Sequence, residues 1–284
     1  MTTKRVAGVE QSVKADGPRA GSVSAPEGVG ALCEAGYVVR FAVSEEDLER
    51  VLRLRFRVFN EELGEGLSES WQTGLDRDRF DGVCHHLMLI HESTDELVGT
   101  YRMQTVAMAR ANGGFYTDQE FALESFPEEV LGRTVELGRA CIEKEHRSGH
   151  ALYALWRGLA LYMTWSGMRY LIGCCSLTSQ DPSEGYAMQA YLEGAGHMNP
   201  DFRVVTREAF LCSRDEPAFE GEVKVPKLFG TYLRYGAVVC STPALDRAFG
   251  TIDFLICLDI DGLDARVRSL FFENFGEALR LGGA

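Results

Sequence analysis

A strand-like run that leads through a short polar loop into an apolar helix, over residues 133–167, most constrains the fold of this chain. Tyr153 and Trp156 are among the apolar positions of that helix. The first backbone N–H groups of a helix have no partner within the helix, so they point outward and attract a phosphate or another anion. The segment therefore predicts a binding site for an acyl carrier. Glu136 and Arg139, in the strand that leads into it, would place charged chemistry beside that site.

Hydrophobic periodicity elsewhere predicts strands alternating with helices. Strands are expected at 38–42, 85–90, 97–106, 134–142, 169–177 and 251–260, and helices at 47–63, 150–166, 183–196, 226–235 and 263–275. Ser44 and Asp47 have the spacing of a capping box at the start of the first helix. A turn at 94–96 joins two strands into an antiparallel hairpin. This pattern indicates an α+β fold, or three-layer α/β sandwich, around a mixed sheet.

Composition limits the partners and the location of the protein. Residues 1–36 lack periodicity, which predicts a flexible tail before a single domain at 37–284. The net charge of −13 argues against nucleic acid, because phosphate binding needs a basic face. No signal-peptide core or membrane-spanning apolar run is visible. The eight cysteines are therefore interpreted as buried free thiols of a cytoplasmic protein, for which peripheral contact with the inner membrane stays open.

Charged residues of both signs follow one another at intervals along the chain. Carboxylates hold an ammonium group and arginine forks hold a carboxylate, so such a set suits a site for a small zwitterion. The alternative is a set of surface ion pairs, which contribute little stability. The residues concerned are Arg53, Arg55, Arg57, Asp76, Asp78, Asp81, Arg102, Glu136 and Arg139.

Side chains alternate between the two faces of a strand, which bears on the pair Glu136 and Arg139 and on a metal site at the adjacent histidines. Glu136 and Arg139 would face opposite sides of a regular strand, but Gly138 between them permits a bulge that turns both toward one cleft. Adjacent His85 and His86 point to opposite faces of their strand, so no metal site is expected there.

Several motifs occur in a characteristic order. They are R-x-x-V-F at 55–59, D-R-F-D at 78–81, G-x-x-R at 99–102, E-L-G-R at 136–139, LWRGL at 155–159, IGCCSL at 172–177, PKLFGTYLRYGA at 226–237 and DRAFGTIDFLICLDI at 246–260. Over residues 37–275 the chain resembles the branch of the GNAT superfamily that contains ornithine-acyl-ACP N-acyltransferases, often labelled hemolysin-like. Acyl-homoserine-lactone synthases are more distant relatives. The resemblance implies a GNAT fold, whose twisted, mostly antiparallel sheet splays open at its middle around an acyl-pantetheine arm.

The resemblance also implies an activity. An N-acyltransferase of this branch would move a long-chain fatty acyl group, 3-hydroxylated or not, from acyl-ACP to the α-amine of an amino acid. Ornithine is the first candidate acceptor, and the product would be a lyso-aminolipid. Three alternatives stay open: a lactone-synthase-like signal synthase, an acetyl-CoA-dependent N-acetyltransferase, and a lipid-binding or acyl-carrier-binding protein without activity. No cofactor is expected to be resident, since acyl-ACP or acyl-CoA is a co-substrate.

In the related lactone synthases, the matching arginine, aspartate and glutamate positions form the active-site charge cluster. By resemblance, Glu136 is the candidate base that removes the proton of the acceptor ammonium, directly or through water. Asp78 and Asp81 are alternatives for that role or for orienting the ammonium. The residues expected to bind substrate are Arg55, Arg102, Arg139 and Trp71, the last as an aromatic side chain that closes over the site or packs beside it.

The loop HRSGHA at 146–151 stands where many GNAT enzymes carry Q/R-x-x-G-x-G/A. His146 in the first position favours ACP, whose phosphopantetheine lacks the diphosphate of CoA. Phe229-Gly230 replaces the Lys-Gly of the relatives, which leaves the choice of amine open. A local basic patch would attract an acidic carrier protein. The residues expected to bind the carrier are Lys144, Arg147, Gly149, His150 and Arg157.

Overall fold

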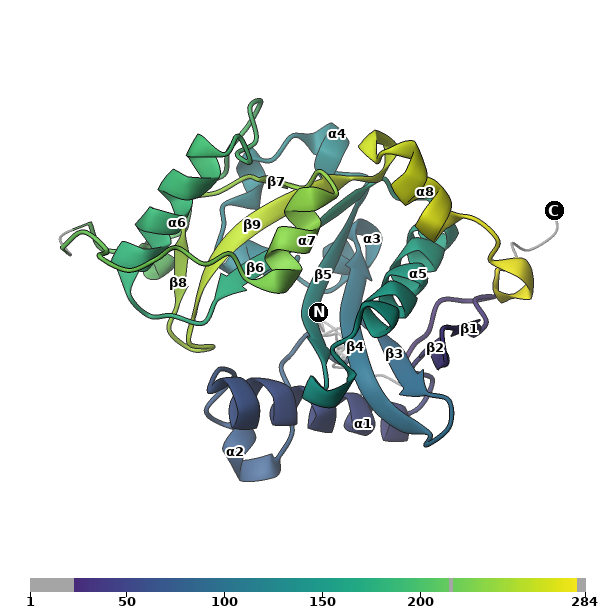
Figure 1. The fold of residues 1–284 in the computed structure, drawn as a ribbon. Coiled ribbons are helices and arrows are strands. Elements are labelled where there is room, and N and C mark those ends of the chain that lie inside the picture. The colour runs from purple at the N-terminus through teal and green to yellow at the C-terminus, as the bar shows by residue number, and fades with distance from the viewer. Residues whose placement is uncertain (1–22, 215–216, 280–284) are drawn as a thin grey trace, which may run out of the picture.

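One twisted, nine-stranded sheet organises the chain in a computed structural model that describes residues 23–214 and 217–279 (Figure 1). Its strand order is β1-β2-β3-β4-β5-β6-β9-β7, and β8 pairs with β9. Within the described residues, all neighbouring pairs are antiparallel except β5 and β6. The expected α+β architecture with a mixed, mostly antiparallel sheet is therefore confirmed. The strands are β1 (Leu32–Glu34), β2 (Tyr37–Phe41), β3 (His85–His91), β4 (Glu96–Thr105), β5 (Thr134–Ile142), β6 (Tyr170–Leu177), β7 (Val238–Val239), β8 (Ala244–Asp246) and β9 (Thr251–Asp259).

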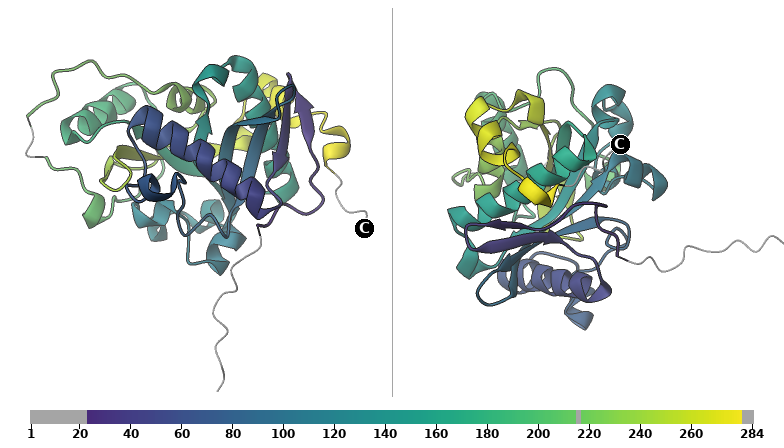
Figure 2. Two further views of the ribbon diagram at one scale, coloured as in Figure 1. Left: turned by 90° about the horizontal axis from the view of Figure 1, so that it is seen from below. Right: turned by 90° about the vertical axis from the view of Figure 1, so that its right-hand side faces the viewer.

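Helices cover both faces of the sheet. α1 contacts β3 and β4 from one side, and α5 contacts the same strands from the other, so the sheet is the middle of three layers (Figure 2). Within the described residues, no helix is long and apolar enough to cross a membrane. The helices are α1 (Glu45–Phe56), α2 (Ser70–Thr73), α3 (Val106–Ala111), α4 (Glu128–Leu131), α5 (Gly149–Ser166), α6 (Pro182–Gly194), α7 (Lys227–Arg234) and α8 (Ala265–Phe272).

The first helix is capped and ends where the sequence predicts. The Ser44 hydroxyl accepts a hydrogen bond of 3.1 Å from the N–H of Asp47 and caps α1, as the capping-box spacing predicts. The helix expected to run to residue 63 does so, but it changes to a π-helix over Arg57–Leu63. Gly158 allows α5 to lie close to the sheet, because a Cβ at this position would lie 2.6 Å from Cγ1 of Val39.

The sheet splays open between β5 and β6. These strands pair only from Thr134 to Glu136 on β5, after which β5 stays with β4 and β6 stays with β9. A Cβ at Gly173 would lie 2.4 Å from the carbonyl oxygen of Leu137, so the strands are still in contact one residue past their last pair. The splay expected at the middle of the sheet is therefore confirmed, and it begins directly after Glu136 (Figure 1).

Short edge strands differ from the prediction. β1 lies inside the expected tail of residues 1–36, since Leu32 is buried in the core and Glu34 pairs with Arg157 of α5. Strands as short as β1, β7 and β8 show no alternation that a sequence pattern could reveal. Residues 1–22 of the expected tail lie outside the described residues. The eight cysteines are free thiols, and all but Cys33 and Cys174 are buried.

Candidate active site at the splay

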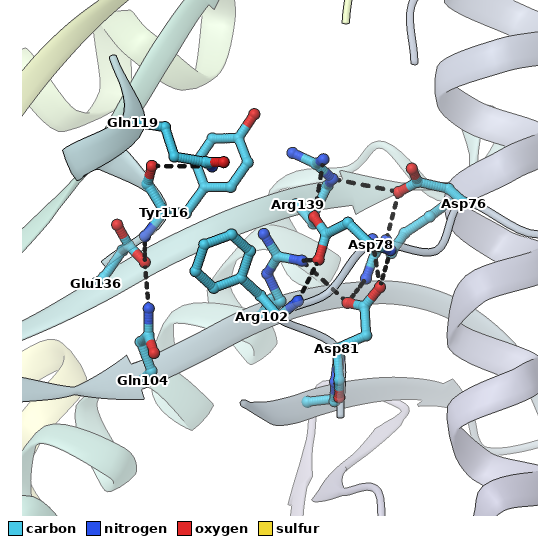
Figure 3. A network of polar contacts seen from close by, with 12 residues as sticks. Asp76, Asp78, Asp81, Arg102, Gln104, Tyr116, Gln119, Glu136 and Arg139 are labelled. Atoms are coloured by element: carbon cyan, nitrogen blue, oxygen red, sulfur yellow. Dashed lines mark hydrogen bonds and ion pairs between the residues drawn. The ribbon is translucent and has the colours of Figure 1, made fainter. Parts of the chain in front are cut away.

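Three arginines and three aspartates lie together beside the splay (Figure 3). Their side chains are between 0% and 13% exposed, which excludes the alternative of surface ion pairs for these six. α1, β4, β5 and the segment that follows α2 each contribute to this group. The members are Arg55, Asp76, Asp78, Asp81, Arg102 and Arg139. Arg53 and Arg57, which the sequence placed in the same set, instead form exposed ion pairs with Glu49 and Glu143.

Each member contacts two members of the opposite charge. Arg55 donates to Asp76 at 2.7 Å and to Asp81 at 2.6 Å. Nη1 of Arg102 donates to Asp81 at 3.0 Å and to Asp78 at 2.6 Å. Arg139 then closes the circuit, because its Nη2 lies 3.1 Å from Asp78 and its Nε lies 3.3 Å from Asp76. We call this closed, alternating set of six side chains the charge ring. A buried charge is costly unless it is paired, and here each charge is paired twice.

The charge ring fixes the ionisation of its aspartates. Burial alone would raise the pKa of Asp81, but Arg55 and Arg102 hold the pKa of its carboxyl far below the usual range. Burial likewise opposes ionisation of Asp78, and Arg102 with Arg139 nevertheless lowers its pKa. Both aspartates therefore stay ionised, which suits the holding of an ammonium group better than the removal of its proton.

A bulge in β5 brings Arg139 into the charge ring. Gly138 pairs with Arg102 and Cys141 pairs with Thr100, so two residues of β5, Arg139 and Ala140, stand opposite the single residue Tyr101 of β4. The expected bulge is present, but the left-handed residue is Arg139, with φ of 49°, rather than Gly138. Such a conformation is strained for a residue with a Cβ, so it needs compensating contacts.

Aromatic rings supply part of that compensation. The Cζ atom of Arg139 lies 4.3 Å from the ring centroid of Phe249 and 5.0 Å from that of Tyr116. An arginine between two aromatic faces gains cation–π attraction in addition to its ion pairs. Tyr116 lies in none of the sequence motifs, and the motif at 246–260 that contains Phe249 does not indicate that its ring meets the charge ring.

Glu136 lies outside the charge ring, on the far side of Tyr116 (Figure 3). Its Oε2 accepts from Gln104 at 2.7 Å and from the N–H of Tyr116 at 2.9 Å. Its Oε1 accepts from the N–H and hydroxyl of Thr117 at 2.8 and 2.7 Å. Glu136 thus anchors the segment that carries Tyr116, and it would have to give up a hydrogen bond to take a proton.

The loop before α5, at residues 144–148, was expected to bind the acyl donor, and we call it the donor loop. It has fewer free cations than expected. Ser148 caps the helix, and Lys144, Gly149 and His150 are exposed beside it. Arg147 makes a bidentate ion pair with Glu62, with both N···O distances 2.6 Å.

Arg157 does not belong to a basic patch, so that prediction is wrong. Its side chain is 4% exposed and donates to the carbonyl oxygens of Phe271 and Glu273 at 2.7 and 2.6 Å. It also pairs with Glu34 at 2.9 Å. The sequence does not show that this face of α5 packs against the end of α8 and the residues that follow it, so the burial of Arg157 was not predictable.

Trp71 lies on α2 and is 61% exposed. It packs edge-on against Phe56 of α1, with 5.2 Å between the ring centroids. Its expected role in closing over a substrate stays a prediction.

A second charged group lies beyond Tyr116 and consists of Glu120, Asp246 and Asp253, all buried. We call it the acidic cluster. The Tyr116 hydroxyl donates to Asp246 at 3.3 Å, so this tyrosine connects the acidic cluster to the charge ring. The one sequence signal that could have revealed it is Asp253, a lone carboxylate within the apolar run of β9.

Comparisons with known proteins agree with this architecture. The family model of the acetyltransferase (GNAT) domain matches residues 54–157. The chain is 30% identical over 257 residues to an L-ornithine N(alpha)-acyltransferase of Agrobacterium fabrum, covering 86% of this chain and 87% of that protein. A protein of the same name from Rhodobacter capsulatus is 30% identical over 249 residues, with coverages of 83% and 94%. The solved structure of an N-acyl amino acid synthase from uncultured soil microbes, 14% identical, superposes with a TM-score of 0.50 over 80% of this chain and 93% of that one, which supports the fold alone.

Proposed function

This chain belongs to the L-ornithine N(alpha)-acyltransferase family, with a GNAT fold and N-acyltransferase activity, and from that premise we propose its substrates and its chemistry. The acceptor is the α-amine of ornithine, and the donor is a long-chain, 3-hydroxylated or plain, fatty acyl group on acyl-ACP. The observation that carries the proposal is the charge ring at the mouth of the splay, where a zwitterion and a thioester would meet.

The acceptor would bind between Arg139 and Asp78, where the charge ring is most open. Arg139 and Asp78 are the two members with the most exposed side chains, at 7% and 13%, and their contact of 3.1 Å is among the longest in the ring. The α-carboxylate of an amino acid would take the guanidinium of Arg139, and its α-ammonium would take Asp78. Arg55, Arg102 and Asp81 would keep these two side chains in place from behind.

The acyl arm would lie in the splay beside the bulge of β5. Backbone N–H groups at residues 138–142 would donate to the thioester carbonyl and stabilise the oxyanion that forms on it. The amine nitrogen forms the new C–N bond, the C–S bond breaks, and the pantetheine thiol leaves with one proton while a second proton goes to water.

Glu136 is our candidate for assisting that proton loss. Its four hydrogen bonds support a role through an intervening water, or through its fixed negative charge, rather than direct contact with the amine. A negative charge fixed before the reaction stabilises the positive charge that develops on the attacking nitrogen.

Acyl-ACP is favoured over acyl-CoA by the loop before α5. Arg147 is already paired with Glu62 and Arg57 is already paired with Glu143, so few cations remain for a diphosphate. The exposed N-terminus of α5 at Gly149 and His150, with Lys144 nearby, would hold the single phosphate of phosphopantetheine.

A direct assay tests the proposal. Purified protein with 3-hydroxyacyl-ACP and ornithine should release ACP thiol and form acyl-ornithine, measured by thiol titration and mass spectrometry; the CoA thioester should react more slowly. Arg139→Met should lower kcat/KM by roughly 10- to 100-fold. Arg203→Met is the matched control, because Arg203 forms an exposed ion pair with Glu193. Absence of thiol release with ornithine and with every other amino acid would refute the proposal.

We also propose a cytoplasmic location with peripheral contact to the inner membrane. The product carries a long acyl chain that partitions into a bilayer, so release at the membrane surface would be favourable. Flotation of the protein with anionic vesicles, before and after product formation, tests this part.

A further inference from the structure

The acidic cluster lacks the cations that complete the charge ring. Among the described residues, no ion pair involves Glu120, Asp246 or Asp253, although all three carboxyl groups are buried. Asp246 is satisfied by the N–H groups of Ala248 and Phe249, both at 2.9 Å, and by Tyr116. Among the described residues, neither the carboxyl group of Glu120 nor that of Asp253 accepts from a backbone N–H. Only side chains lie beside them: Cys174 beside Glu120, and Ser176, Thr251 and Glu120 beside Asp253. A buried carboxylate is costly unless a cation or donors accompany it.

Atoms without partners converge on this place. Oδ1 of Asp253 is buried without a hydrogen-bond partner, and so is the hydroxyl of Thr251, two residues earlier on the same face of β9. Carboxyl oxygens of Glu120 and Asp253 and the sulfur of Cys174 lie within 4.8 Å of one another. Burial and mutual repulsion raise the pKa of Glu120 well above its usual range, as expected where a cation is missing.

The position of the acidic cluster relates it to the proposed site. Tyr116 faces Arg139 with its ring and reaches Asp246 with its hydroxyl. Cys174, whose sulfur lies 3.9 Å from both carboxyl oxygens of Glu120, directly follows Gly173 at the splay. A group bound at the acidic cluster is therefore one tyrosine side chain away from an amino acid bound at Arg139.

We infer that the acidic cluster binds the side-chain ammonium of a diamino-acid acceptor while its α-amine is acylated at the charge ring. This inference rests on the proposed function. An ammonium has three N–H donors and a positive charge, which Glu120, Asp253 and the Thr251 hydroxyl would accept together.

The arrangement also selects between the two amines of such an acceptor. Carboxylates around the side-chain ammonium keep it protonated, and a protonated amine has no lone pair with which to attack a thioester. The acidic cluster therefore directs acylation to the α-amine.

A divalent metal ion is the competing occupant. Glu120, Asp253 and Cys174 are possible ligands, and a cysteine binds a metal as its thiolate. In the structure the Cys174 thiol is a weak hydrogen-bond donor to Glu120, with its sulfur 3.9 Å from both carboxyl oxygens. A neutral thiol suits packing against the methylene groups of an amino-acid side chain, so the ammonium is the better occupant.

Charge-removing variants of similar size test the inference. Glu120→Gln and Asp253→Asn should each lower kcat/KM for ornithine by roughly 10- to 100-fold. The same variants should leave kcat/KM for norvaline, which is ornithine without its side-chain amine, unchanged or higher. Glu129→Gln, an exposed carboxylate on α4, is the matched control and should change neither value. Mass spectrometry should also find acylation of the side-chain amine only in the first two variants.

Several results would overturn the inference. An equal loss with ornithine and norvaline would mean that the acidic cluster is only structural, and a wild-type protein that uses both equally would mean that it recognises no ammonium. Loss of the ornithine preference in EDTA and its return with zinc would assign the site to a metal. Failure of wild-type protein to acylate ornithine would instead refute the proposed function. Calorimetry without acyl donor then tests the acidic cluster alone. The inference requires the Kd of ornithine to be at least ten-fold lower than that of norvaline.

Discussion

The closed charge ring makes a strong prediction about Asp76, whose Oδ2 bridges Arg55 at 2.7 Å and Arg139 at 3.3 Å. Its other carboxyl oxygen is buried without a hydrogen-bond partner, so Asp76→Ala removes the two ion pairs and little else. Removing one partner of a buried ion pair costs about 3–5 kcal/mol of unfolding free energy, because the remaining charge stays buried and incompletely paired. Arg55→Met should cost a similar amount, since its side chain is fully buried between Asp76 and Asp81.

The double variant is the informative one. Without Arg55 and Asp76, the ring becomes an open chain of Asp81, Arg102, Asp78 and Arg139 that is still neutral and fully paired. The double variant should therefore lose at least about 2 kcal/mol less than the sum of the two single losses.

Urea unfolding with linear extrapolation measures all three variants. Arg53→Ala is the matched control, two residues earlier on α1, because its ion pair with Glu49 is exposed and should be worth less than about 0.5 kcal/mol. Single losses that add to the double loss within about 0.5 kcal/mol would refute the idea that the six side chains stabilise one another as a ring.

Three further predictions concern the acidic cluster, the splay and the donor loop. Burial raises the pKa of Glu120, so its carboxyl group destabilises the folded chain increasingly as pH rises above the ordinary glutamate range. In calorimetric scans without ligand, Glu120→Gln should therefore raise the Tm, and by more at pH 8 than at pH 5. A lower Tm of this variant at pH 8 would contradict this. Gly173→Ala would place a Cβ 2.4 Å from the Leu137 carbonyl oxygen, so it should cost about 1–3 kcal/mol in urea unfolding and reduce acyl transfer, while Gly194→Ala, which has open space at the end of α6, should not. Lys144→Glu should raise KM for acyl-ACP several-fold and leave KM for an acyl-pantetheine thioester unchanged, because this donor lacks both the phosphate and the carrier protein that would meet the exposed side chain. Equal effects on both donors would contradict a role in holding the carrier.

The regular elements of the fold follow closely from local patterns in the sequence. The apolar run at 134–142 becomes β5 with the same bounds, and Ser44 caps α1 as its spacing predicts. These features depend on neighbours a few residues away, which is why periodicity and capping preferences are sufficient to find them.

The site follows only in part from the sequence, for a geometric reason. The order of the charged motifs indicates that Arg55, Asp78, Asp81 and Arg102 meet, and they do. The closing role of Asp76 was not predictable, because it depends on the left-handed conformation that carries Arg139 back toward it.

The acidic cluster was hidden for a related reason. Glu120 comes from a segment between α3 and α4, and Asp253 comes from β9, so only the tertiary fold places them together. Arg157 shows the opposite case. The sequence places this basic residue near a predicted anion site, but its guanidinium donates to backbone carbonyl oxygens of the C-terminal segment instead.

The splay has a consequence for how the chain folds. From β1 to β6 each strand lies beside its predecessor in the sequence, so the half of the sheet that ends at β5 forms by pairing consecutive strands. The second half, β6 to β9, is joined to it by three residue pairs and the crossover through α5. We therefore expect the first half to become ordered early and the two halves to dock late. Because the bulge of β5 and the acid of β9 come from different halves, binding competence would be among the last properties that a newly made chain acquires.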